Sequence, residues 1–396
     1  MYLRFTREEE TFRQEVRDFL KRELPLGWDG MTKHEFCSDE GWAFYRDFTR
    51  KVAGKGWLQM HWPVEYGGQG ASPMKMTVFV EEMAYHQAPM IPEAGWIGPT
   101  IIMYGDEEHK KKYLPGTAAG EIEWCIAYSE PGAGSDLFSL KTKAEEDGDS
   151  FVINGQKIYT SFAHKADYCF LAARTDSDKP KHFGISIFIV DMKTPGITVR
   201  PLLDMGGSHA FNEVFFDNVR VPMDCLIGKK NDGLSIIITE LDLERASGAG
   251  ADMAGRSQRF LEKLIAYAGE TNHRGEPLSN DPMIRQALVE REVEIEVTRL
   301  LAYRVVWLLT KGIVAQAEAS VSKVYGNEMQ HRLAKTGLEL LGMYGTLQDD
   351  PKRSRLIKEV WDMCLFSFSW LFAGGTNEIQ KNIIAMRGLG LPKVQV

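Results

Sequence analysis

A glycine-rich loop at residues 131–136 (Pro-Gly-Ala-Gly-Ser-Asp) has the composition of a ligand-binding turn. It follows a short apolar run, Trp124–Ala127, which predicts a β-strand. Because glycine and serine have small side chains, the backbone N–H groups of such a loop can approach a flat or an anionic ligand. A plain turn between two strands would have the same composition. The loop alone leaves both interpretations open.

A second segment, Gly374-Gly-Thr-Asn-Glu-Ile-Gln380, changes this balance. Together, in this order, the two segments resemble the two flavin-contacting signatures of the acyl-CoA dehydrogenase family. A Pro63-x-x-Tyr-Gly-Gly element also matches, and the resemblance covers essentially the whole chain. It implies an FAD-dependent oxidoreductase of lipid or fatty acid catabolism, as in β-oxidation. Such an enzyme converts an acyl-CoA thioester to the trans-2-enoyl-CoA and passes its electrons to an electron-transferring flavoprotein.

This reaction needs a carboxylate that removes the proton beside the thioester carbonyl. Many family members carry it at the position of Gly374, where this chain has no side chain. A smaller branch, which includes isovaleryl-CoA dehydrogenases, carries it within Leu-Asp-Leu-Glu-Arg, and this chain has that run at residues 241–245. The resemblance therefore predicts Glu244 as the base and leaves Gly374 to bind the thioester oxygen through its N–H. Glu240, one turn earlier on the same helix face, is the alternative base, and a solvated helix carboxylate is the other interpretation of Glu244.

The resemblance also assigns residues to the flavin. Tyr159 and Ser161 stand where the family has Trp-x-Thr/Ser, which places a hydroxyl near flavin N5. Glu339 stands where glutamine is common, and a carboxylate near the pyrophosphate is unfavourable. Either Glu339 turns away or the adenine half of FAD is held differently. The remaining assignments are Tyr128, Ser129, Gly134 and Ser135 along the isoalloxazine and pyrophosphate; Arg274, Gly342, Thr376 and Glu378, with Glu339, on the adenine side from neighbouring subunits; and Ser135 with Arg245 on the substrate.

Three zones of the sequence must position these residues. We expect an α+β multidomain protein with an N-terminal helical domain (1–121), a central antiparallel β domain (122–232) and a C-terminal four-helix bundle (233–396). Asn154-Gly155 predicts a hairpin turn. Helical periodicity marks residues 6–23, 39–55, 74–86, 100–113, 234–268, 283–310, 314–341 and 352–372, and strands are expected at 183–191 and 211–222.

Composition excludes several other classes. A net charge of −8 without a basic stripe argues against nucleic acid as a partner. No apolar run approaches the ~20 residues of a membrane helix, and the N-terminus opens on a capping box, Thr6-Arg-Glu-Glu9, rather than a secretory signal. The five cysteines show no CxxC spacing, so we expect free thiols and no metal site. These features predict a bacterial cytoplasmic protein.

The acyl group and the assembly stay open at this level. Linear, branched, alicyclic, dicarboxylic and steroid-derived CoA esters are all candidates. His209 is either a ligand-side donor or, with the better prior, a satisfied loop histidine. We expect a homotetramer, with a hetero-oligomer possible; the alternatives are a non-catalytic, flavin-poor subunit and an O2-using oxidase. A wide acyl slot is predicted where Pro89, Pro92, Gly95, Gly98 and Pro99 interrupt the helices.

Overall fold

The computed structural model describes residues 5–91, 93–247, 250–273, 275–346 and 354–392. The chain forms two compact units. Unit 1 contains Met1–Phe36, Ser72–Met90 and Arg245–Val396, and unit 2 contains Cys37–Ala71 and Ile91–Glu244. Each unit combines separate stretches of the chain, whereas the boundaries predicted at 121/122 and 232/233 divide the chain into consecutive domains. Those boundaries stay predictions.

Unit 2 is built on one sheet with the strand order β6-β7-β3-β2-β4-β5-β8, and β1 pairs with β4. The pairs are antiparallel, as predicted, except that β4 pairs in parallel with β1 and, at one residue pair, with β2. The strands are β1 (Trp124–Ala127), β2 (Lys143–Asp147), β3 (Ser150–Lys157), β4 (Tyr168–Arg174), β5 (Ile185–Asp191), β6 (Ile197–Leu202), β7 (Phe211–Pro222) and β8 (Leu226–Ile227).

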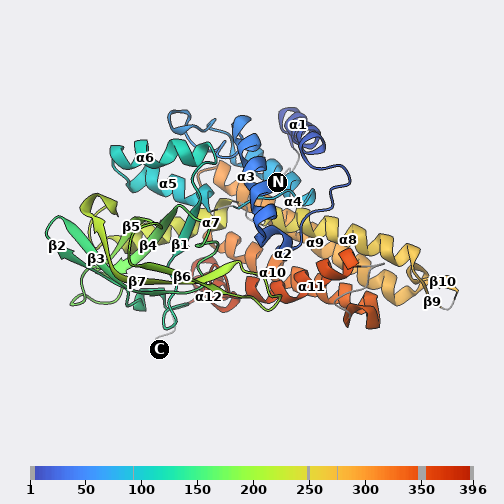
Figure 1. Ribbon diagram of the computed structural model, residues 1–396. Coiled ribbons are helices and arrows are strands. Elements are labelled where there is room, and N and C mark those ends of the chain that lie inside the picture. Colours follow the sequence, from blue (N-terminus) through green and yellow to red (C-terminus); the bar gives the residue numbers. More distant parts are fainter. Residues whose placement is uncertain (1–4, 92, 248–249, 274, 347–353, 393–396) are drawn as a thin grey trace. The chain divides into compact units, whose positions relative to one another are not determined.

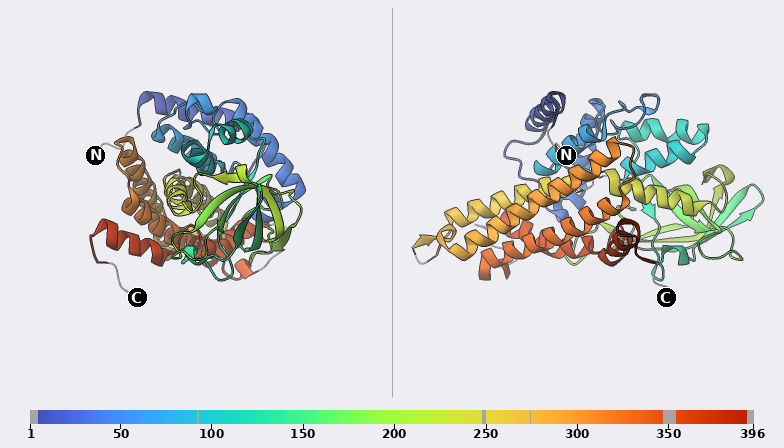
Figure 2. Two further views of the ribbon diagram at one scale, coloured as in Figure 1. Left: turned by 90° about the vertical axis from the view of Figure 1, so that its left-hand side faces the viewer. Right: turned by 180° about the vertical axis from the view of Figure 1, so that it is seen from behind.

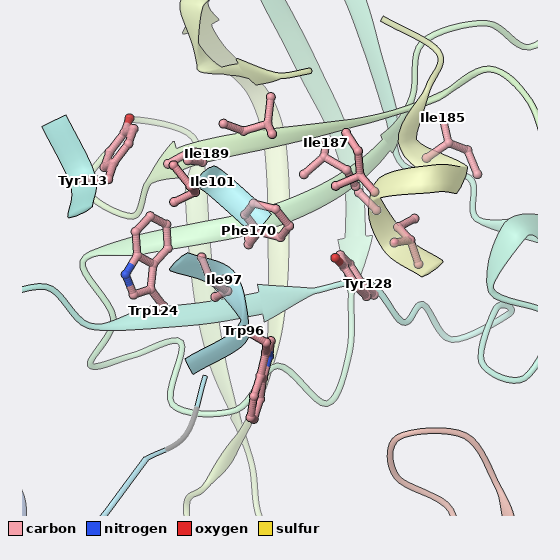
Figure 3. Close-up of a cluster of buried hydrophobic side chains, with 14 of the residues drawn as sticks. Trp96, Ile97, Ile101, Tyr113, Trp124, Tyr128, Phe170, Ile185, Ile187 and Ile189 are labelled. Atoms are coloured by element: carbon pink, nitrogen blue, oxygen red, sulfur yellow. The ribbon is translucent and has the colours of Figure 1, made fainter. Parts of the chain in front are cut away.

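Side chains of the central strands alternate between two apolar clusters, because successive residues of a strand face opposite sides of the sheet. Phe170 of β4 packs into a cluster with helices α5 (Ala94–Tyr104), α6 (Glu107–Ala118) and α7 (Gly233–Ser247) (Figure 3). Its neighbour Leu171 packs into the opposite cluster, where Phe151 and Phe188 meet edge to face with ring centroids 5.0 Å apart. The central strands are therefore covered on both faces, whereas β2 and the edge strand β6 stay largely exposed on one.

The hairpin predicted at Asn154-Gly155 was wrong, because β3 runs straight through these residues. Its pairing with β7 shifts register between Ile153 and Gly155, which marks a β-bulge. A Cβ on Gly155 would lie 2.4 Å from the hydroxyl oxygen of Thr142, so the close approach of the two chains requires glycine here. The actual turn between β2 and β3 lies at Gly148, whose φ is +66°.

The helix predicted over 100–113 is two helices, α5 and α6, because Asp106 caps α6 by accepting the His109 N–H at 2.9 Å. Gly95, Gly98 and Pro99 lie inside α5, so the prediction that they interrupt a helix was wrong. Proline 99 has no N–H to donate to the Gly95 carbonyl, and the His61 imidazole Nε2 lies 3.2 Å from that oxygen. Pro92 lies outside the described residues. Unit 2 also contains α3 (Asp39–Gly54), which was predicted, and the 3₁₀ turn Val64–Tyr66.

Unit 1 is helical, and its bundle of four long helices confirms the prediction. Helices α8 (Ala251–Glu270), α9 (Pro282–Thr310), α10 (Gln316–Leu341) and α11 (Ser354–Trp370) run alongside one another (Figures 1 and 2). The single helix predicted over 234–268 is wrong: α7 ends at Ser247, and α8 starts after Gly250, whose φ is +98°. The other elements are α1 (Arg7–Glu23), α2 (Lys33–Cys37), α4 (Pro73–Tyr85), α12 (Asn377–Ile383), β9 (Asn272–His273) and β10 (Glu276–Pro277).

Two buried carboxylates on α4 join α1 and the bundle within unit 1. The carboxylate of Glu82 lies 2.8 Å from Nη1 of Arg13 on α1. Its neighbour Glu81 accepts hydrogen bonds from Nε of Arg299 at 2.8 Å and from the Tyr303 hydroxyl at 2.6 Å, both on α9. Because each carboxylate has cationic or hydroxyl partners, burial of both is tolerated.

Acid should weaken unit 1 through Glu82. Burial disfavours its charged form, but hydrogen bonds from His86, Arg17 and Arg13 outweigh burial and lower the carboxyl pKa from 4.5 to about 2. A depressed carboxyl pKa stabilises the fold above the unfolded-state pKa, and this stability is lost as the pH falls through the folded-state pKa. At pH 7 it amounts to at most roughly 3 kcal/mol. We expect Glu82→Gln to lower the free energy of unfolding at pH 7 and to flatten its decline between pH 5 and pH 2, as measured by urea unfolding. An unchanged acid limb would contradict this account.

Candidate active site

Unit 2 brings two of the predicted flavin-binding segments together. Strand β1 leads through Tyr128 and Ser129 into the glycine-rich loop, and β3 leads into Tyr159 and Ser161. The two segments are joined where the Ile158 N–H donates to the Ser129 carbonyl at 2.9 Å. This backbone bond holds the two segments side by side, although they lie some thirty positions apart in the sequence.

The glycine-rich loop has the groups that a flavin or its pyrophosphate requires. It closes through reciprocal bonds between Glu130 and Ala133, with N···O distances of 2.9 and 3.0 Å. Within the described part of the chain, the N–H groups of Gly134 and Ser135 donate to no protein atom, and both residues are exposed. A Cβ on Gly134 would meet nothing within 4 Å, so this side of the loop is open. Such a set of outward N–H groups fits an anionic or flat ligand such as FAD.

A buried ion pair anchors this loop to β3. Lys157 is fully buried, and its Nζ lies 2.8 Å from the Glu130 carboxylate and 3.0 Å from the Tyr128 carbonyl. The other carboxylate contacts are the backbone N–H groups of Lys141 and Thr142, at 2.6 and 2.8 Å. Burial lowers the pKa of Lys157 to about 8, although Glu130 favours its charged form. This pair was not predicted from the sequence, because no pattern near Lys157 or Glu130 in the sequence indicates that they are in contact.

The segment that follows β3 is held in an unusual conformation. Tyr159 and Phe162 have φ values of +59° and +50°, in the left-handed region that residues with a side chain rarely adopt. Each costs on the order of 1–2 kcal/mol. The Tyr159 ring is 62% exposed and touches Phe211 edge to face. These two left-handed residues lie on either side of Ser161. The strained backbone therefore flanks the residue that the resemblance places near flavin N5.

Helix α7 carries both candidate bases. Glu240 is 1% exposed, whereas Glu244, one turn later, is half-buried. Burial, then Glu240 and more weakly Glu244, raise the pKa of Tyr128. Both carboxylates therefore act electrostatically on the strand that enters the flavin loop. Glu240 lies beside Tyr128, and Glu244 is the less buried of the two.

A third acidic side chain shares these surroundings and was missed by the sequence analysis. Glu93 precedes α5, and its Oε2 is buried without a hydrogen-bond partner among the described residues. Burial, then the charges of Glu123 and Glu244, raise the pKa of Glu93 to about 7. A signal existed, because Glu93 is the only charged residue in the otherwise apolar and neutral stretch 87–105.

In unit 1, the second signature forms a left-handed turn that requires glycine. Gly374 and Gly375 have φ values of +61° and +83°. Nε2 of Gln380 donates to the Gly374 carbonyl at 3.0 Å, and Nζ of Lys323 donates to the Gly375 carbonyl at 3.0 Å. Thr376 then caps α12 by accepting the Ile379 N–H at 3.2 Å. The positive φ values therefore favour glycine at both positions.

The other predicted adenine-side residues lie on the surface or outside the described part. Glu339 is exposed on α10, with its carboxylate 3.8 Å from Nζ of Lys335, and Gly342 ends that helix with a φ of +56°. Glu378 is exposed on α12. Arg274 and the side chain of Arg245 lie outside the described residues. Their roles toward FAD and substrate stay predictions.

No group of three or more His, Cys, Asp or Glu side chains among the described residues could hold a metal ion. All five cysteines are free. None of the described helices combines the length and apolarity needed to cross a membrane.

Comparison with known proteins places this geometry in a family. Three family models match the chain: the acyl-CoA dehydrogenase N-terminal domain at residues 6–121, the middle domain at 125–219 and the C-terminal domain at 231–389. Acyl-CoA dehydrogenase FadE29 of Mycobacterium tuberculosis is 35% identical over 396 residues, covering 100% of both chains.

Solved structures agree. A structure described as the Tcur3481-Tcur3483 steroid ACAD has a TM-score of 0.90 and 34% identity, covering 100% of both chains. The ChsE4-ChsE5 complex from Mycobacterium tuberculosis has a TM-score of 0.87 and 33% identity, again covering 100% of both chains. The predicted fold class and the FAD cofactor are thereby confirmed at the level of the family. This chain belongs to the acyl-CoA dehydrogenases, flavin-dependent oxidoreductases that act on the CH–CH bond of acyl-CoA thioesters.

Proposed function

We propose that Glu244 is the base of this acyl-CoA dehydrogenase and removes the proton beside the thioester carbonyl. The observation that carries the proposal is its place on α7, where its charge acts on Tyr128 at the entrance to the flavin loop. Glu244 is half-buried, and a base must lie within hydrogen-bond reach of the proton that it removes. Bound FAD supplies the hydride acceptor, so that loss of a proton and a hydride gives the trans-2-enoyl-CoA.

The remaining residues of the site bind and orient. The Gly374 N–H donates to the thioester oxygen, where negative charge develops as the proton leaves. When FAD is bound, Ser161 would supply a hydroxyl near N5, and Tyr159 would lie where the family has an indole. Ser135 and Arg245 hold the substrate. Tyr128, Ser129 and Gly134 line the flavin, and a neighbouring subunit contributes Arg274, Glu339, Gly342, Thr376 and Glu378 on the adenine side.

The substrate we propose is a bulky alicyclic CoA thioester, with an electron-transferring flavoprotein in the bacterial cytoplasm as acceptor. The substrate proposal is supported by a structural neighbour that is described as a steroid ACAD. Another neighbour is described as the ChsE4-ChsE5 complex. The same neighbours make a hetero-oligomer a strong alternative to the homotetramer. A flavin-poor subunit of such an assembly is the second candidate function.

The visible spectrum of the purified protein tests these proposals. We expect a yellow protein whose flavin band bleaches anaerobically on addition of one class of CoA thioester, and bleaching by steroid-derived but not linear esters would support the substrate proposal. A colourless protein that stays so with added FAD would favour the subunit function. Peroxide released in air at the rate of turnover would identify an oxidase instead.

A further inference from the structure

The strained segment 159–162 is tied to β7 and the loop before it by three hydrogen bonds, one of them from the buried side-chain amide of Asn212. Asn212 of β7 is 0% exposed and contacts Thr160 from two sides. The Thr160 N–H donates to the Asn212 backbone carbonyl at 3.1 Å, and Nδ2 of Asn212 donates to the Thr160 carbonyl at 2.9 Å. The Phe162 N–H donates to the Ala210 carbonyl at 2.8 Å. The backbone on either side of Ser161 is therefore tied to β7 and the loop before it.

Two histidines orient this amide. Nδ1 of His164 lies 3.2 Å from Oδ1 of Asn212, and Nε2 of His209 lies 2.8 Å from the same oxygen. The two rings are stacked, with centroids 3.8 Å apart and planes 13° from parallel. His209 is thus a satisfied loop histidine, as the sequence analysis favoured. Because the Thr160 carbonyl only accepts, Nδ2 must face it, and both imidazoles must donate to Oδ1.

The surroundings support a neutral His164. Burial, then the nearby His209 and Lys165, lower the pKa of His164 to about 4, while Asp39 opposes this weakly. Nζ of Lys165 is itself engaged with the Asp39 carboxylate at 2.6 Å. A neutral His164 avoids charge repulsion in the stack and keeps the tautomer that donates from Nδ1.

We propose that Asn212, oriented by the stacked pair His164 and His209, is a positioning residue that holds the left-handed segment 159–162 in its flavin-binding conformation. Strained backbone persists only where its surroundings over-determine it. Here the Asn212 side chain donates to the Thr160 carbonyl, and the two imidazole N–H groups fix the orientation of that side chain. The proposal rests on the proposed function to the extent that this segment faces FAD.

The test uses three variants of the full-length holoprotein and the apoprotein made from it. Asn212→Ala removes the side-chain hydrogen bond to the Thr160 carbonyl but keeps the backbone bond from the Thr160 N–H, and His209→Phe keeps the ring stack but removes one hydrogen bond to Oδ1. The control is Asn154→Ala: Asn154 also bonds an asparagine of β7, Asn218, but it is exposed and lies within β3, six residues before Thr160. FAD affinity of the apoprotein, the absorption spectrum and midpoint potential of bound FAD, and the unfolding temperature are measured.

We expect Asn212→Ala to weaken FAD binding roughly 10- to 100-fold and His209→Phe about 3- to 10-fold, both with an altered flavin spectrum and potential. The control should match the wild type in all flavin measurements. Folded variants with wild-type FAD affinity, spectrum and potential would overturn the proposal, and His209→Phe decides if Asn212→Ala does not fold. Wild-type protein that binds FAD but is reduced by no CoA thioester would refute the proposed function and leave this test valid. Wild-type protein that binds no FAD would overturn both.

Discussion

Replacing Glu244 with glutamine is expected to lower turnover of the CoA thioester by roughly 10²- to 10⁴-fold while FAD stays bound. Glutamine keeps the shape of the side chain but cannot take up the substrate proton. Because Glu244 is half-buried and glutamine nearly matches it in shape, the unfolding temperature should change little. Single-turnover flavin reduction at saturating thioester measures the effect on the chemical step directly.

Glu240→Gln is the matched comparison, because the same change is made one helical turn earlier on the same helix. Glu240 is 1% exposed and faces Tyr128, so we expect its loss to alter flavin-loop stability more than proton abstraction. Flavin reduction should then stay within about tenfold of the wild type. Rapid reduction in Glu244→Gln together with slow reduction in Glu240→Gln would reverse the assignment of the base.

Local sequence signals were sufficient for elements whose ends are set by nearby residues. The capping box at Thr6 predicts the start of α1, and the structure shows both of its reciprocal hydrogen bonds. Strand β7 begins and ends at the predicted residues, Phe211 and Pro222, because alternation and the terminal proline are both local. The same holds for the glycine-rich loop, whose composition already indicates exposed backbone N–H groups.

Predictions failed where a distant partner decides the local conformation. Asn154-Gly155 is a strong turn signal, yet pairing with β7 and the close approach of Thr142 convert it into a bulge. Pro99 is a helix breaker by propensity, but His61 contacts the carbonyl that the proline leaves unpaired, and α5 continues. In both cases the residue that overrides the signal lies too far along the chain for a local pattern to include it.

The candidate site divides in the same way. Its backbone loops could be predicted, because small residues and glycines mark them in the sequence. Its electrostatics could not: the raised pKa of Glu93 depends on burial and on Glu123 and Glu244, which come from other elements. The hydrogen bond from Asn212 to Thr160 likewise joins β7 to the segment after β3, and nothing in the sequence distinguishes Asn212 from an ordinary strand residue.

The buried pair Lys157 and Glu130 leads to the second large expected effect. Lys157→Met should lower the free energy of unfolding by about 3–5 kcal/mol, because it leaves the Glu130 carboxylate buried without its cation. Methionine fills most of the volume of the lysine stem, so the loss reports the missing charge rather than a cavity. Urea unfolding followed by circular dichroism measures it.

Lys230→Met is the control for this change. Nζ of Lys230 lies 2.7 Å from the Glu146 carboxylate, but the two side chains are 38% and 46% exposed. An exposed pair contributes at most about 1 kcal/mol, so this variant should stay close to the wild type. A similar small loss in Lys157→Met would show that Glu130 accommodates the missing cation, by protonation or hydration, and would contradict the account.

A double variant separates charge from position. Lys157→Met with Glu130→Gln leaves no unpaired charge, and it should recover part of the stability that Lys157→Met loses. Affinity for FAD should stay reduced in the double variant, because this variant also lacks Nζ of Lys157. That atom donates to the Tyr128 carbonyl at 3.0 Å and so joins the glycine-rich loop to the segment that begins at Tyr159. Recovery of both quantities together would mean that the ion pair stabilises the sheet but does not position the flavin-binding loops.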